Sequence, residues 1–388
     1  MVDTVLLKIP HPDFAVMKYE QFTPNARGIF HEPYLPFNGQ PFIKCINNPT
    51  KQDKEQGIYL PRLTVYKRVS RGGFGINLHI ELSLPKLMYG NNFDELTDDD
   101  FEDLLTKLAK QLFLMGVMVR KEKLRAAKVY AIHYSKNIPF VDYTTSSLIL
   151  SYLTKVKVTQ RMDVNFTDFR NEGEAARYYA KNHEFVCYDK IADLGKSKDR
   201  AIEKDDRKYN LQTDIFAAIR QQQIPIEVLR LELRLKSRAK MKHIFGKIGL
   251  AEDFTFGAMF KQTVAQKALQ YYWGIIFDEL MSVLLQDMSF AEEFSFVAKQ
   301  RPQWKPQRVF AAIGLRRMIL EEGHRKARRR FEKCGNGRTM DRVYKDIKDL
   351  DFKVLNRAKP FQQVTSALVD FTPLRMKDFD LPAKCNTL

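Results

Sequence analysis

The sequence is poor in cysteine and has no long apolar run. Its 388 residues include only 4 cysteines, and no two of them form a Cys-x-x-Cys pair. Scattered single cysteines argue against a zinc site and against a disulfide framework. No apolar run approaches the ~20 residues of a membrane-spanning helix, and residues 1–4 lack the basic start of a signal peptide. We therefore expect a cytoplasmic protein with no membrane partner.

Acidic residues are also scarce relative to basic ones. The chain has 64 Lys and Arg against 47 Asp and Glu, a formal charge of +17. Such a surplus predicts a polyanionic partner, with nucleic acid as first choice. An anionic membrane surface is the second choice, and the lack of a long apolar run argues against it. A hydrophobic fraction of 44% and an aromatic fraction of 12% are typical of a globular protein. The length allows two domains.

The stretch 184–190 combines a strand pattern with a chemically useful pair of side chains. Its aromatic and β-branched residues favour extended backbone, which places Tyr188 and Lys190 on the same side. A nearby ammonium lowers the pKa of a phenol and stabilises a phenolate nucleophile or the phosphate that it attacks. The alternative is a half-buried tyrosine beside a solvated lysine.

Several other runs alternate with the period of a strand. Residues 4–9 form one run, and residues 63–70 and 76–84 form a hairpin whose second strand projects His79 and Glu81 from its polar face. These two side chains suit a divalent metal, although a solvated polar face has the same pattern. Residues 128–136 form a further strand that carries His133, which is either structural or functional.

The most regular alternation lies at residues 228–235. Leucine occupies every odd position from 229, and Arg230, Glu232 and Arg234 occupy the even ones. This pattern predicts a strand with one face against helices and one charged face for chemistry or for phosphate. Helical spacing follows a Thr97 cap over residues 101–115, with Gly116 as the stop, and recurs at 144–156, 211–222 and 254–288.

The basic charge is concentrated near the C-terminus. Residues 301–348 contain 15 Lys and Arg against 5 Asp and Glu, a surplus of ten. A helix at 309–320, a basic segment, a Gly-Asn-Gly turn at 335–337 and a second helix capped by Thr339 suit a DNA-binding unit. A solvated basic face is the alternative. The candidate phosphate contacts are Arg325, Lys326, Arg328, Arg329 and Arg330.

Three stretches in this order carry a resemblance to a known family. They are residues 79–92 (HIELSLPKLMYGNN), residues 185–190 (FVCYDK) and residues 228–236 (VLRLELRLK). The chain resembles the gene II protein family, the rolling-circle replication initiators of filamentous phages and related plasmids. The similarity covers most of residues 1–265, and a weaker one covers roughly 300–360.

The resemblance implies a site-specific DNA nickase that also rejoins strands. Tyr188 would be the nucleophile that retains the 5′-phosphate, with Lys190 as its cationic neighbour. Glu81 and Glu232 would hold Mg²⁺ or Mn²⁺, with His133 and His79 as further ligand candidates. Relatives tend to have Arg-x-Asp where this chain has His133 at the third position, and a histidine suits Mn²⁺ better than Mg²⁺.

The resemblance also implies a fold, partners and a division into domains. We expect an α+β fold, with a mainly antiparallel, ferredoxin-like sheet that has helices on one face and its charged face open. Residues 1–265 would be catalytic, 266–300 a helical connector and 301–388 a basic helical DNA-binding region. Double-stranded origin DNA, displaced single-stranded DNA, and a host helicase and polymerase are the implied partners, with Arg230 and Arg234 as further DNA contacts. The rival interpretation is a DNA-binding regulator without catalysis.

Overall fold

The chain folds around one large antiparallel sheet. The computed structural model describes residues 1–31, 42–70, 73–140, 144–164, 166–170, 174–193, 227–250, 252–283, 289–350 and 359–375. Within these residues nine strands pair in the order β3-β4-β5-β1-β7-β11-β10-β9-β8, and every pairing is antiparallel. The predicted α+β class, with a mainly antiparallel sheet, is confirmed.

The predicted strands are all present, and most are longer than their patterns suggest. In sheet order they are β3 (Phe42–Asn47), β4 (Arg62–Ser70), β5 (Gly73–Ser83), β1 (Val2–Pro10), β7 (Lys128–Phe140), β11 (Glu227–Leu235), β10 (His183–Asp189), β9 (Ala175–Ala180) and β8 (Phe166–Arg170). A small second sheet pairs β2 (Phe14–Val16) with β6 (Val117–Val119).

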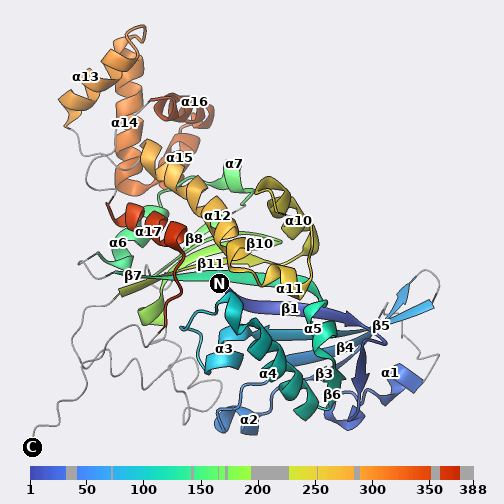
Figure 1. Cartoon of the computed structure of the whole chain (residues 1–388). Coiled ribbons are helices and arrows are strands. Elements are labelled where there is room, and N and C mark those ends of the chain that lie inside the picture. The colour runs from blue at the N-terminus through green and yellow to red at the C-terminus, as the bar shows by residue number, and fades with distance from the viewer. Residues whose placement is uncertain are drawn as a thin grey trace, which may run out of the picture.

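Helices make up most of the remaining described chain, as Figure 1 shows. Short ones are α1 (Arg27–His31), α2 (Lys51–Glu55), α3 (Leu84–Tyr89), α5 (Lys121–Arg125), α7 (Thr159–Met162), α11 (Phe256–Met259) and the 3-10 turns η1 (Tyr19–Gln21) and η2 (Asp98–Asp100). Longer ones are α4 (Phe101–Leu114), α6 (Ser146–Leu153), α10 (Arg238–Lys247), α12 (Gln262–Val283), α13 (Phe290–Gln300), α14 (Pro306–Glu322), α15 (His324–Lys333), α16 (Gly337–Lys348) and α17 (Lys359–Asp370).

Helix α4 begins and ends where the sequence predicts. Thr97 and Asp100 form a reciprocal capping box, which satisfies backbone N–H groups at the start of the helical segment. Gly116 follows the helix with φ of 71°, a left-handed conformation that suits glycine. A Cβ at Gly116 would also lie only 2.6 Å from Cβ of Lys18. Both the backbone conformation and the close approach of Lys18 therefore favour glycine at position 116, where the helix ends.

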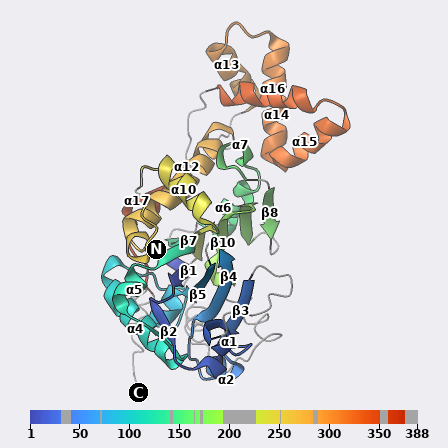
Figure 2. The ribbon, with the colours of Figure 1, turned by 90° about the vertical axis from the view of Figure 1, so that its right-hand side faces the viewer.

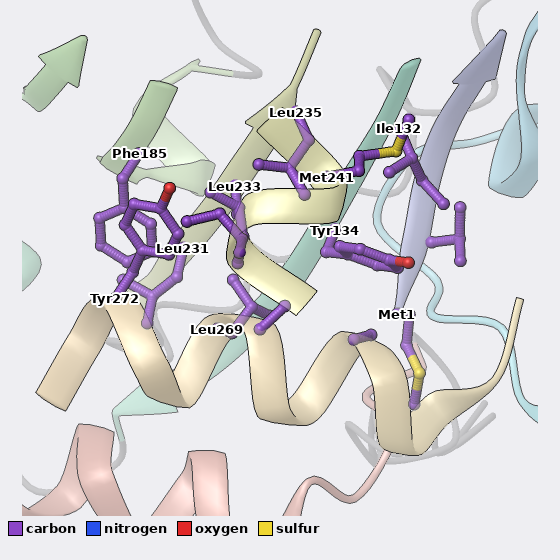
Figure 3. Packing of buried hydrophobic residues seen from close by; sticks show 14 of the residues in the cluster. Met1, Ile132, Tyr134, Phe185, Leu231, Leu233, Leu235, Met241, Leu269 and Tyr272 are labelled. Atoms are coloured by element: carbon purple, nitrogen blue, oxygen red, sulfur yellow. The ribbon is translucent and has the colours of Figure 1, made fainter. Parts of the chain in front are cut away.

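The core lies between one face of the sheet and the helices. Leu231, Leu233 and Leu235 are fully buried and pack toward α12 and α10 (Figure 3). The ring of Phe185 stacks on that of Tyr272 from α12, with 5.6 Å between centroids. Across the described residues no helix has both the length and the apolar character needed to cross a bilayer.

Helices α13 to α16 form a helical unit at the end of α12, which α16 contacts. They extend away from the sheet in both views (Figures 1 and 2). Val309, Ile313, Met340 and Ile347 are buried where α14 and α16 pack together. The helix predicted at 309–320 is confirmed, and the basic segment after it is itself helix α15. Thr339 lies inside α16, which begins at Gly337, so its predicted role as a cap is wrong.

Helix α17 and the residues after it return to the sheet. Helix α17 contacts α12 and β7. The backbone N–H of Glu95 donates to the carbonyl of Leu374 (3.0 Å), and the N–H of Leu374 donates to the Glu95 carboxylate (2.9 Å). Residues 359–375 thus lie beside the sheet, although the sequence groups them with the basic region 301–388. The helix predicted at 211–222 and Cys385 lie outside the described residues.

Candidate functional site

Four adjacent strands each place a reactive side chain on the polar face of the sheet. Asp3 comes from β1, His133 from β7, Glu232 from β11 and Tyr188 from β10. One ligand atom from each of Asp3, His133 and Glu232 lies within 4.8 Å of the others. The hydroxyl of Tyr188 lies 3.5 Å from Oε2 of Glu232. Two carboxylates, an imidazole and a phenol therefore share one small volume.

Asp3 reaches this face through an irregularity in β1. Between β1 and β7, Val2 pairs with Tyr134 and Thr4 with His133, so two steps on β1 match one step on β7. Such a bulge shifts the side-chain alternation by one residue. Without it, Asp3 would share the buried face of Val5 and Leu7. The sequence pattern therefore misses Asp3, because strict alternation places it in the core.

Glu232 is the most heavily engaged group of the site. Its carboxylate accepts two hydrogen bonds from Arg234, at 2.9 and 3.0 Å, and lies 3.4 Å from Nδ1 of His133. Burial opposes the charged form, but the hydrogen bond with His133 and the charge of Arg234 outweigh it, so the pKa of Glu232 is held well below its usual range. Glu232 is therefore an anion at any ordinary pH.

Tyr188 is half-buried, and its phenol is held in the neutral form. Burial raises the pKa of Tyr188 well above its ordinary value. The charge of Arg230 lowers this pKa and the charge of Glu232 raises it, and each of these two effects is smaller than that of burial. The sequence predicted a lowered phenol pKa from Lys190, and the structure has the opposite direction because burial outweighs the nearby cations. Tyr188 must therefore lose its proton to a base during any attack.

Lys190 is fully buried beside this phenol. Its Nζ donates to Oδ1 of Asn92 (2.9 Å) and lies 5.9 Å from the centroid of the Tyr188 ring. Burial, assisted by the charge of Arg230, lowers the pKa of Lys190 to about 7. A lysine with that pKa exists in both protonation states near neutral pH. It is therefore suited to accept and return a proton.

Arg230 supports the site from within instead of facing solvent. It is 2% exposed, and its guanidinium lies 2.8 Å from Oδ1 of Asp3. It also donates to the carbonyl of Asn92 and to the side chain of Asn137. Arg230 and Glu232 are thus buried, so the expectation of an entirely open charged face is wrong for β11. Arg234, by contrast, keeps a third of its side chain exposed.

A cleft of about 490 Å³ opens next to Tyr188. Arg177, Glu184, Arg234 and Lys236 are among the residues that line it. Glu184 forms ion pairs with Arg177, Arg234 and Lys236. Burial raises the pKa of Glu184, but the hydrogen bonds from Arg177 and Lys236 outweigh burial and lower this pKa to about 2. Glu174, Asp189 and Asp193 also line the cleft, which thus presents a strongly polar surface with charges of both signs to a ligand that approaches the phenol.

Two of the predicted metal ligands lie elsewhere on the same face. Glu81 and His79 belong to β5, which is separated from β11 by β1 and β7. Three steps of ~4.8 Å put these two strands roughly 14 Å apart, and the register also offsets Glu81 from Glu232 along the strands. The His79 ring lies between those of Tyr66 and Tyr130. Among the described residues, neither joins the group formed by Asp3, His133 and Glu232.

The predicted basic contacts on α15 divide into two sets. Arg328 pairs with Glu332 and Asp341, and Arg330 pairs with Glu322. Arg325, Lys326 and Arg329 are exposed, and no ion pair involves them within the described residues. Exposed cations of α16 also face solvent at helical spacing, namely Arg338, Arg342 and Lys345. These last three lie in the basic region but were not singled out by the sequence.

A search of protein families, of curated proteins and of solved structures finds no match for this chain.

Proposed function

We propose that the chain is a DNA-nicking and strand-rejoining enzyme that initiates rolling-circle replication, with Tyr188 as its nucleophile. The observation that carries this proposal is the place of the Tyr188 hydroxyl, 3.5 Å from the Glu232 carboxylate and beside Asp3 and His133. The net charge of +17 suits a DNA substrate. The resemblance of residues 79–92, 185–190 and 228–236 to the gene II protein family points to the same chemistry.

The reaction begins with attack of the Tyr188 oxygen on a backbone phosphorus. The bond from phosphorus to the 3′-oxygen breaks, and this oxygen takes a proton from water. One end of the nicked strand is then a free 3′-hydroxyl, and the other end is a 5′-phosphotyrosine ester. A 3′-hydroxyl attacks the same phosphorus in the reverse step and releases the tyrosine. Because one phosphodiester replaces another, strand rejoining needs no external energy source.

Lys190 is suited to take the proton of the phenol. Its pKa of about 7 means that a large fraction is neutral at physiological pH. Its hydrogen bond to Asn92 fixes Nζ near the Tyr188 ring. A neutral amine can accept the phenolic proton as the new ester forms, and the resulting ammonium can return it when the 3′-hydroxyl attacks.

Asp3, His133 and Glu232 fit a divalent metal by their donor types. Two carboxylates and an imidazole are suitable ligands for Mn²⁺ and, less well for the imidazole, for Mg²⁺. Oδ1 of Asp3 is buried and accepts no aligned hydrogen bond, although the Arg230 guanidinium lies near it. It therefore has a lone pair available for a metal. A bound ion would neutralise the scissile phosphate and polarise its ester bond.

The decisive experiment compares two tyrosines on the same face of the sheet. Tyr188→Phe removes only the hydroxyl, so the variant should fold and bind origin DNA but should not nick it. Tyr179→Phe is the matched control, because Tyr179 is half-buried on β9 directly opposite Glu184, on the same polar face as Tyr188. The substrate is supercoiled DNA of the replicon that encodes the chain, with Mg²⁺ or Mn²⁺. Denaturing gels and peptide mapping then locate the covalent 5′ adduct.

The outcomes separate this proposal from its rival. A covalent adduct on Tyr188 in the parent, and its loss in Tyr188→Phe alone, would support the nickase. If Tyr188→Phe still forms the adduct, the nucleophile is a different residue. If the parent binds the origin but never forms an adduct with either metal, the chain is a DNA-binding regulator without catalysis.

A further inference from the structure

A row of aromatic rings crosses the polar face of the sheet away from the candidate site. It consists of Phe42 on β3, Tyr66 on β4, His79 on β5 and Tyr130 on β7, and we call it the aromatic row. Successive ring centroids are 5.9, 4.7 and 5.8 Å apart. Lys8 of β1, which pairs with His79 in the ladder, places its Nζ 5.8 Å from the centroid of the Tyr130 ring. Rings from four strands thus form one continuous surface.

These rings do not belong to the hydrophobic core. Their strand neighbours Val65, Leu78 and Val129 point to the other face and are fully buried there. The rings themselves are half-buried, and Tyr130 is 40% exposed. On a one-sided antiparallel sheet the second face is normally solvated and polar. A row of aromatic side chains on that face is therefore a surface suited to a flat ligand.

The charge around the aromatic row is mostly positive. Lys44 lies opposite Tyr66 in the ladder, and Arg68 lies opposite Phe42. Lys128 lies beside Lys8. Lys44, Arg68 and Lys128 are exposed, and Lys8 is half-buried. Burial and the charge of Lys8 lower the pKa of His79 to about 4, so its ring is neutral at physiological pH. Neutral rings with cations at their margins match a ligand of flat bases and anionic phosphates.

We propose that the aromatic row binds the unpaired bases of single-stranded DNA, which stack on its rings while the surrounding cations contact the phosphates. Duplex DNA does not fit this chemistry, because its bases are already stacked on one another. The choice of DNA rests on the proposed nicking function, in which the aromatic row holds the opened strand. Along β1, Lys8 lies five residues from Asp3, which at ~3.3 Å each is roughly 16 Å, or about five stacked nucleotides.

Binding without cleavage tests the aromatic row directly. A fluorescently labelled oligothymidine of about 20 nucleotides is titrated with the full chain in excess chelator, and anisotropy gives the dissociation constant. Tyr130→Ala should weaken binding about tenfold, since one stacked base is lost. Tyr130→Phe keeps the ring and should bind like the parent. Phe113→Ala removes another exposed aromatic ring, on α4, and serves as the matched control.

Two further measurements make the result unambiguous. Affinity for a duplex of the same length should be equal in Tyr130→Ala and the parent, because the duplex offers no unpaired bases. Phe42→Ala, at the other end of the row, should repeat the loss for the single strand. Parental affinity in both alanine variants, or an equal loss in Tyr130→Phe, overturns the aromatic row as a stacking surface. That outcome would not contradict the proposed role of Tyr188 in nicking. Conversely, nicking by Tyr188→Phe would not contradict the binding of single strands by the aromatic row.

Discussion

At the scale of single residues, the candidate site is organised by charges that are compensated inside the protein. Glu232 is 4% exposed and is bound by Arg234 and His133, and Asp3 is bound by Arg230. Buried charges are expensive unless they are paired, so these arginines explain how ligand atoms of two carboxylates can lie within 4.8 Å of each other. A pair of carboxylates at this spacing suits a divalent cation.

Two chemically equivalent substitutions test which glutamate belongs to the proposed metal site. Glu232→Gln removes one negative charge from the group with Asp3 and His133, so nicking should need a metal concentration at least about tenfold higher. Glu81→Gln is the matched control, because it makes the same chemical change on an exposed side chain of β5. The measurement is nicking rate against Mn²⁺ concentration. Equal shifts in both variants, or unaltered nicking in excess chelator, would contradict the assignment.

The proposed role of Lys190 as a base predicts how the nicking rate depends on pH. The amine acts as a base only when it is neutral, and its pKa of about 7 places that change near neutrality. Below pH 7 the nicking rate should therefore rise by about tenfold per pH unit, and it should level off above. Lys190→Met keeps the length of the side chain but has no basic group, so it should slow nicking and remove the rise. Exposed Lys181→Met is the control, and a parental profile in Lys190→Met would exclude Lys190 as the base.

At the scale of elements, periodicity predicts the sheet well but not its irregularities. The alternation in β5 and β11 identifies their buried faces, because one side of each strand packs against helices. In β7 the alternation is interrupted, since Val129, Ile132 and Tyr134 are all buried, and the strand extends beyond residue 136 to Phe140. The sequence pattern did not identify Asp3, because a bulge in β1 turns its side chain to the polar face of the sheet. Glu81 was predicted as a ligand from its strand alone, and the separation of β5 from β11 follows from a strand order that no local pattern specifies.

Charge composition has a similar limit in the helical unit. It identified residues 301–348 as basic, yet ion pairs engage Arg328 and Arg330 within the unit. Which cations remain available depends on how α15 packs against its neighbours, and this packing brings Asp341 of α16 to Arg328. Composition is read from the sequence, whereas pairing between helices is a property of the fold.

The start of α15 predicts an acid sensitivity of the helical unit. His324 is 5% exposed, packs edge-on against the Tyr344 ring, and has a buried Nε2 without a hydrogen bond. Burial, with smaller effects from Lys157 and Arg328, lowers its pKa to about 3. Between pH 6.5 and 3 the unfolded chain takes up a proton that the folded chain excludes. Folding stability should therefore fall as the pH drops through this window, by up to ~1.4 kcal/mol per pH unit.

Urea unfolding of the full chain at several pH values, followed by a probe in α13–α16, measures this effect. His324→Phe keeps a buried ring against Tyr344 but cannot take up a proton, so its stability should fall less between pH 6.5 and 5. Above pH 7 the histidine is neutral in both states, and the parent and the variant should then show the same pH slope. If the stability of the parent and of the variant falls equally between pH 6.5 and 5, His324 does not contribute to the acid sensitivity.

At the scale of the whole molecule, the candidate site and the strongest positive charge lie on different parts of the chain. The site lies on the sheet, whereas α13 to α16 extend beyond the far end of α12 (Figures 1 and 2). Residues 301–348 supply ten of the seventeen net positive charges. This separation suggests that the helical unit binds duplex DNA while the sheet holds the strand to be cut, so the two activities should be separable by mutation.

Neutralising the exposed face of α15 should weaken duplex binding without impairing the chemistry. The double variant Arg325→Gln and Arg329→Gln removes two exposed cations one helical turn apart. If both contact phosphates, the slope of log affinity against log salt concentration should decrease by roughly two, because each lost contact releases about one counterion fewer. Nicking of a short single-stranded substrate should stay within about twofold of the parent rate, since the sheet is unchanged.

Arg328→Gln, whose side chain is paired with Glu332 and Asp341, is the control and should leave the salt slope as it is. A parental salt slope in the double variant would mean that α15 is a solvated basic helix and that the duplex is bound elsewhere.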